Sequence, residues 1–178
     1  ISSPGRNRPF DRNCAGQGPP SFRGFDDPEK LGKLFDLLSS ISKKIPLVFP
    51  IHPRTRKSAE QIGILPQLDQ SKELLLLDPL NYVRFMNLVF NCRFALTDSG
   101  GIQEETTYLK IPCLTVRENT ERPVTIEVGT NILIGADPDK IIAAAGDVFA
   151  GKTKSGAIPE LWDGKAAERI VKILHEDS

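Results

Sequence analysis

The chain has 178 residues, a length typical of one globular domain. Hydrophobic residues make up 39% of it and charged residues 26%, which favours a packed soluble domain over a disordered segment. Lys plus Arg and Asp plus Glu both number 23, so no overall basic charge is present to attract nucleic acid or an acidic membrane. The longest uncharged stretch, residues 13–22, has ten residues, whereas a membrane span needs about 20.

The first 25 residues have no regular apolar period. Prolines and glycines interrupt this stretch, and its basic side chains are Arg6, Arg8, Arg12 and Arg23. We predict an irregular arm over 1–25 that is solvated rather than packed, because breakers at this density prevent regular structure. The alternative interpretation is that these arginines form an arm that binds phosphate.

From Asp26 onward, short apolar runs alternate with amphipathic stretches of helical length. Asp26, Asp27 and Pro28 are typical of a helix start. The sequence predicts strands near 47–51, 74–77, 94–97, 113–116 and 132–134, and helices near 26–41, 54–62, 82–90, 101–109, 138–150 and 164–175. Runs that are apolar on both faces indicate parallel strands covered by helices. We therefore expect one α/β domain over 26–178, a doubly wound, Rossmann-like parallel sheet of about five strands.

The strongest local signal for chemistry is the segment 97–105, Thr-Asp-Ser-Gly-Gly-Ile-Gln-Glu-Glu. It joins the third strand to a helix, and ligands of such sheets bind where strands end and helices begin. Gly100 and Gly101 let a ligand approach the backbone, the free amides of the first helical turn favour a phosphate, and Ser99 adds a hydroxyl. Glu105, one turn on, is placed to accept hydrogen bonds from a ribose. The structural alternative is an ordinary strand–helix turn.

The same nine residues resemble the signature of the non-hydrolysing UDP-N-acetylglucosamine 2-epimerase family. The resemblance continues in further segments, in the family's order: Phe49–Arg56, Asp78–Tyr82, Arg117–Pro123, Glu127–Asn131 and Trp162–Ile170. It implies one lobe of a two-lobed fold like that of the B-type glycosyltransferases. By this resemblance the chain is the C-terminal, UDP-binding lobe.

The resemblance also implies roles for single residues. Ser99, Gly100 and Gly101 match the family's diphosphate site, and Glu105 matches its ribose contact. Arg122 and Glu121 stand in the Glu-Arg-Pro segment, where we expect Arg122 to orient carboxylates of the helix that follows the glycine turn. A weak surface ion pair is the alternative for Arg122. His52 corresponds to a cleft histidine, or else serves as a structural hydrogen-bonding group.

The resemblance stops abruptly before Asp26. Family members have a Thr-Leu-His-Arg-type stretch there, the first strand of the lobe, which brings a histidine and an arginine to the cleft. Here the window 18–25 reads Gly-Pro-Pro-Ser-Phe-Arg-Gly-Phe, with no histidine, and the first residue is Ile1 rather than Met. We hypothesise that 1–25 is not native family sequence but results from a frame change, a gene-fragment junction or a cloning artefact.

The family reaction inverts C2 of the sugar by eliminating UDP and adding it back. Its proton-transferring carboxylates belong to the N-terminal lobe, so we assign no catalytic residue here and expect weak UDP binding without turnover. The resemblance implies no metal and no cofactor, and it implies a UDP-sugar and the missing N-terminal lobe as partners, with a homodimer left open. The alternatives are a hydrolysing epimerase, a glycosyltransferase donor lobe or a non-catalytic binding fragment.

Cysteine use points to the compartment of the protein. Cys14, Cys92 and Cys113 are too few and too scattered for a disulfide framework or a zinc cluster. None has a neighbouring histidine that would indicate a nucleophile. We expect a reducing, cytoplasmic setting, with the cysteines filling the core.

Overall fold

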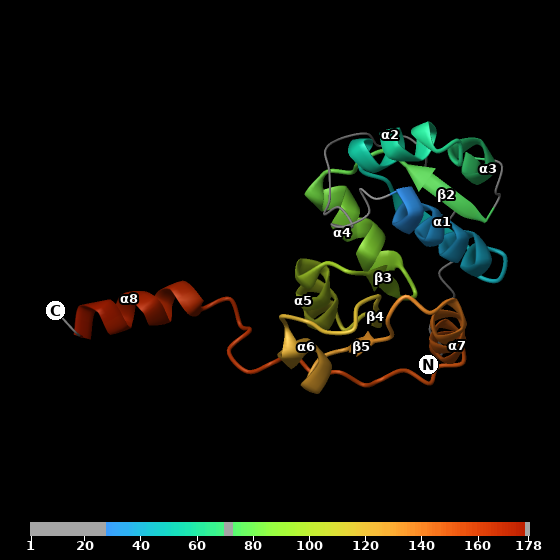
Figure 1. Ribbon diagram of the computed structural model, residues 1–178. Coiled ribbons are helices and arrows are strands. Elements are labelled where there is room, and N and C mark those ends of the chain that lie inside the picture. The colour runs from blue at the N-terminus through green and yellow to red at the C-terminus, as the bar shows by residue number, and fades with distance from the viewer. Residues whose placement is uncertain (1–27, 70–72, 177–178) are drawn as a thin grey trace.

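The computed structural model describes residues 28–69 and 73–176. The predicted arm at 1–25 lies outside these residues, and so does Cys14. The described part holds these helices and strands in chain order (Figure 1): α1 Pro28–Ser42, β1 Leu47–Pro50, α2 Pro53–Gln61, α3 Leu65–Asp69, β2 Leu74–Leu77, α4 Tyr82–Asn91, β3 Ala95–Thr97, α5 Gly100–Leu109, β4 Cys113–Thr115, α6 Pro123–Glu127, β5 Asn131–Leu133, α7 Pro138–Phe149 and α8 Ala166–Glu176. The predicted elements are present, and the short helices α3 and α6 are additions that the apolar pattern did not indicate.

Every strand pair of the described residues is parallel, as the buried apolar runs predicted. β1 pairs with β2 from Leu47 opposite Leu74, and β4 lies between β3 and β5. The expected five strands therefore form two sheets, β1–β2 and β3–β4–β5, rather than one. Within the described part of the chain, β1 pairs only with β2 and β3 pairs only with β4, so no backbone hydrogen bonds join the two sheets.

Helix α1 holds the two sheets together. Its residues Leu31, Phe35 and Leu38 belong to a core cluster with Ile51 and Leu74, at the β1–β2 sheet. Other residues of α1 contribute to a second cluster around β4 and α7. Its buried members are Leu37, Ile41, Ile45, Leu114, Ile141 and Ala145. The apolar spacing of α1 thus covers both sheets with one helix.

The inner edges of β1 and β3 face the same region. Leu47 of β1 and Leu96 of β3 each pack against both clusters, although no strand pairing joins their strands in the described residues. In a right-handed β-α-β crossover, the strand that precedes α1 would pair with β1. Because β2 occupies the other side of β1, that position lies between β1 and β3, where the described residues place no strand.

Helix α8 stands apart from this body. Figure 1 shows it projecting from the rest of the molecule at the end of the extended segment that follows α7. Its large apolar side chains are more than half exposed: Ile170, Val171, Ile173 and Leu174. No described helix is both long and apolar enough to cross a membrane.

Gly129 is required by packing where the loop after α6 crosses α5. A Cβ at this position would lie 2.4 Å from Thr107 Oγ1 and 2.6 Å from the backbone oxygen of Thr125. Because a backbone oxygen cannot turn aside, Gly129→Ala is expected to lower the free energy of unfolding by about 1–3 kcal/mol in urea denaturation. Gly146→Ala on α7, where a Cβ meets nothing within 4 Å, is the control and should stabilise. An unchanged midpoint for Gly129→Ala would contradict this packing.

Candidate functional site

The glycine turn lies at the carboxyl end of β3, where α5 begins. Ser99 is the N-cap of α5 by its extended backbone, with φ −83° and ψ 125°, but its hydroxyl caps no amide within the described residues. The Ser99 amide donates to Thr97 Oγ1 at 3.0 Å, which fixes the turn. The first amides of α5 therefore keep their capacity to donate to an anion.

Neither glycine of this turn is required by packing or by the backbone. A Cβ at Gly100 would lie 3.7 Å from Arg122 Cγ, and one at Gly101 would lie 3.9 Å from Ser99 Oγ, both ordinary contact distances. Neither residue is among the described positions with positive φ. What the two glycines provide is access to the backbone, which is the property that a bound phosphate needs.

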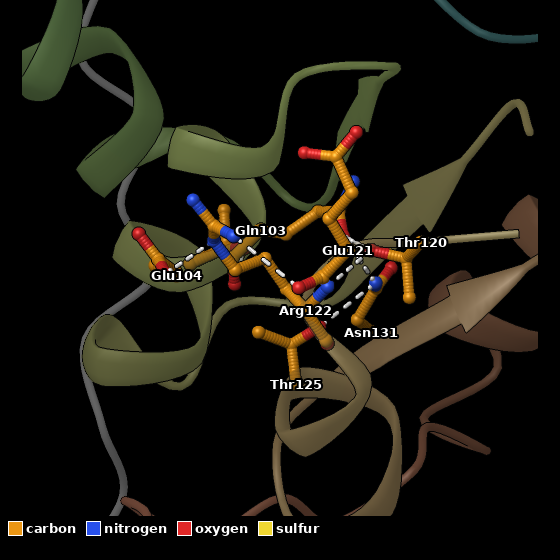
Figure 2. Close-up of polar contacts among 8 residues, drawn as sticks. Gln103, Glu104, Thr120, Glu121, Arg122, Thr125 and Asn131 are labelled. Carbon is orange, nitrogen blue, oxygen red and sulfur yellow. Dashed lines mark hydrogen bonds and ion pairs between the residues drawn. The ribbon is translucent and has the colours of Figure 1, made fainter.

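Arg122 lies against the same turn. Its Nε is 2.6 Å from Glu104 Oε1, and both side chains are about 40% exposed (42% and 41%). Figure 2 shows its guanidinium beside Glu104, whereas the carboxylate of Glu121 points away from it. Glu121 contacts Arg122 through its backbone oxygen, which accepts from Arg122 Nη1 at 3.2 Å. An ion pair this exposed adds little stability, so its consequence is the direction of the guanidinium.

Glu105 shares its carboxylate with Tyr82 at the start of α4. The Tyr82 hydroxyl donates to Glu105 Oε1 at 3.0 Å. This hydrogen bond and the negative charge of Glu105 raise the pKa of Tyr82, so the phenol keeps its proton. Oε1 keeps a second lone pair, and Oε2 accepts no hydrogen bond from the described residues, so the carboxylate still has acceptors for a ribose hydroxyl.

Asp98 precedes Ser99 in the turn and is half-buried. Burial raises the pKa of Asp98, although Arg117 acts in the opposite direction. Arg117 and Glu118 line a hollow of about 390 Å³ with Gly135 and Lys140, where β4 and β5 end and α7 begins. It lies at the same edge of the sheet, because parallel strands end together, but none of Ser99, Gly100, Gly101 or Glu105 lines it.

His52 lies at the end of β1, in the other sheet. It is exposed and acts as the N-cap of α2, since its Nδ1 accepts from the Arg54 amide at 3.2 Å. No contact joins His52 to the glycine turn in the described part of the chain. The structure therefore gives this histidine a capping role and leaves its cleft role a prediction.

Cys92 and Cys113 are free cysteines. Cys113 is fully buried, and burial raises the pKa of Cys92 to about 12. Both thiols are therefore protonated near neutral pH, which agrees with the expected role of filling space rather than attacking a substrate.

A group of polar residues behind the turn was not predicted from the sequence. Gln103, Thr125 and Asn131 are fully buried and hydrogen-bond to one another or to Thr120 (Figure 2). Thr115, also fully buried, donates to Asn131 Oδ1. The sequence did carry a signal for this group. Helix α5 has the polar residues Gln103, Thr106 and Thr107 on its buried face, where apolar residues are usual.

Comparison with known proteins bears on this site. The model of one protein family, described as UDP-N-acetylglucosamine 2-epimerase, matches residues 23–175. The chain belongs to that family. A UDP-N-acetylglucosamine 2-epimerase of Methanococcus maripaludis is 44% identical over 151 residues. A UDP-2,3-diacetamido-2,3-dideoxy-D-glucuronate 2-epimerase of Pseudomonas aeruginosa is 34% identical over 150 residues.

The fold of this chain is also that of solved family members. The crystal structure of Methanocaldococcus jannaschii UDP-GlcNAc 2-epimerase in complex with UDP-GlcNAc and UDP superimposes with a TM-score of 0.74 at 38% identity. The match covers 85% of this chain and 42% of that one. The chain likewise spans 41% of the Methanococcus relative, as expected for one lobe. The match of the family model begins at residue 23, close to where the resemblance begins.

Proposed function

We propose that this chain is the UDP-binding C-terminal lobe of a UDP-N-acetylglucosamine 2-epimerase. In this proposal the amides of Gly100 and Gly101 and the Ser99 hydroxyl hold the diphosphate, and Glu105 accepts from the ribose. Arg122 stands beside the diphosphate, held by Glu104. The sugar is left to the rest of the protein, since the named relatives act on different sugars that share the UDP group.

One observation carries the proposal most directly. The start of α5 combines uncapped amides, two glycines that the fold does not require, and a guanidinium over Gly100. Each of these features favours an anion, and together they present amide donors and a positive charge to one point. An ordinary strand–helix turn needs only a cap, and this turn lacks a side-chain cap within the described residues.

The test is a titration of the ¹⁵N-labelled chain with UDP, followed by NMR. We expect shifts at Gly100, Gly101 and Glu105, with a dissociation constant between high micromolar and millimolar, about −4 to −6 kcal/mol. Uridine, which lacks the diphosphate, should leave the two glycine amides unshifted. No shifts of these residues at about 10 mM UDP would overturn the proposal.

In this proposal the epimerase reaction also needs groups of the N-terminal lobe. Removing the proton from C2 needs a base, and the resemblance assigns that base to the N-terminal lobe. We expect the chain alone to form no UDP-N-acetylmannosamine from UDP-N-acetylglucosamine, as followed by NMR of the sugar protons. Turnover by the pure chain would contradict this division of labour.

The absent N-terminal lobe has a candidate contact in α8. Its apolar face, defined by Ile170, Ile173 and Leu174, is more than half exposed, and exposed apolar surface of this kind is typical of an interface. In this proposal α8 packs on the N-terminal lobe. We also propose that the protein lies in the cytoplasm, a reducing compartment in which Cys92 and Cys113 stay free.

A further inference from the structure

A connected set of polar side chains lies between the glycine helix and the loop that carries Arg122. Its members come from α5, β4, the loop before α6, α6 itself and β5: Gln103, Thr115, Thr120, Thr125 and Asn131, called here the threonine–amide cluster. All but the half-buried Thr120 are fully buried. Buried polar groups cost stability unless paired, so the pattern of their pairing carries information.

The hydrogen bonds of the cluster can run in one consistent direction only. Thr125 donates its one hydroxyl proton to the Arg122 backbone oxygen at 2.7 Å. It must therefore accept from Asn131 Nδ2 at 3.1 Å, which fixes how the Asn131 amide is turned. Asn131 Nδ2 then donates its second proton to Gln103 Oε1 at 3.1 Å, and Asn131 Oδ1 accepts from Thr115 at 2.6 Å.

The same donor–acceptor assignment fixes the direction of the Thr120 hydrogen bond. Gln103 Oε1 has no proton to give, so the Thr120 hydroxyl must donate to it, at 2.5 Å. The lone pairs of the Thr120 hydroxyl are then directed at the Arg122 amide, which donates to it at 3.0 Å. Arg122 is thus held at its backbone nitrogen by Thr120 and at its backbone oxygen by Thr125.

The cluster therefore fixes the backbone from which the Arg122 side chain reaches the turn. That side chain passes Gly100, with Cγ 3.7 Å from where a Cβ of Gly100 would lie, and ends in the contact with Glu104. We infer that Thr120, oriented by Gln103 and Asn131, is a positioning residue that sets the Arg122 guanidinium against the diphosphate site. This inference rests on the proposed binding of UDP at the turn.

The experiment compares Thr120→Val, which keeps the shape but removes the hydroxyl, with Thr120→Ser, which keeps the hydroxyl. The control is Thr130→Val, because Thr130 is a buried threonine whose hydroxyl donates to the Ile111 backbone oxygen at 2.7 Å, outside the cluster. Each variant is measured by urea denaturation, by the NMR signal of the Arg122 Nε proton, and by titration with UDP.

We expect Thr120→Val to shift and broaden the Arg122 Nε signal and to weaken UDP binding about fivefold to tenfold. Thr120→Ser should restore both readouts, and Thr130→Val should leave both as in the wild type even where it lowers stability. The inference is overturned if Thr120→Val keeps the wild-type Nε signal, or if Thr130→Val weakens UDP binding as much. If the wild type itself binds no UDP, the proposed function fails, and the Nε signal alone decides the inference.

Discussion

Gly101→Val is expected to weaken UDP binding at least tenfold while the domain stays folded. Gly101 is exposed, and its nearest atom to a new Cβ is Ser99 Oγ at 3.9 Å, so the side chain enters open space. That space is where a phosphate must lie to reach the first amides of α5. Losing one or two such hydrogen bonds to a charged group corresponds to at least about 1.4 kcal/mol, which is tenfold.

The control for this variant is Gly146→Val, which places the same side chain at a helical glycine with nothing within 4 Å of its Cβ. It should bind UDP as the wild type does, by the same NMR titration. Gly101→Ala should be intermediate, because a methyl group obstructs less of the approach. If Gly101→Val binds UDP with unchanged affinity, the phosphate does not lie at the start of α5.

The second large effect concerns the position between β1 and β3, in which no strand from residues 28–69 or 73–176 lies. A strand-forming sequence placed before α1 should pair there and join the two sheets, since the β-α-β rule directs it to the free side of β1. We propose Gly16→Val, Gly18→Val, Pro19→Thr and Pro20→Val together, which remove four breakers from the segment before α1. The expected gain is at least about 2 kcal/mol, or about 4–8 °C in Tm.

The matched control carries Gly18→Pro instead of Gly18→Val, with the other three changes kept. A proline in the middle of a strand between two neighbours removes a hydrogen bond, so this variant should lose most of the gain. Hydrogen exchange gives the location: the amides of Val48 and Leu96, which point away from β2 and β4, should exchange more slowly in the first variant alone. Equal Tm values for the variant and its control would show that no strand enters between β1 and β3.

The split sheet shows what an apolar pattern can and cannot predict. Alternating apolar runs and amphipathic stretches were enough to predict five strands and their helices, because burial on both faces demands apolar residues on both. The apolar pattern does not predict which strands pair, because strand pairing depends on backbone N–H and C=O groups that nearly every residue has. The pattern therefore could not show that β1 and β3 would not pair with each other in the described residues.

The candidate site divides in the same way. The Ser99–Gly100–Gly101 turn was predicted from local sequence, because a strand end, two glycines and a helix start are adjacent in the chain. The Arg122–Glu104 pair joins residues 18 positions apart in sequence, and the expectation that Arg122 meets a carboxylate of α5 left open which one. His52 was predicted for the cleft or for a structural role; it is the N-cap of α2, and its cleft role stays a prediction.

By itself the sequence determined the order of strands and helices, the glycine turn and the family, since these depend on local spacing and on residues that lie next to one another. Only the tertiary structure decided that Gln103, Thr120 and Asn131 meet behind that turn. They come from separate elements, and no spacing rule joins them. A hydrogen bond needs a donor and an acceptor atom within about 3 Å, and only folding brings residues far apart in the sequence to that distance.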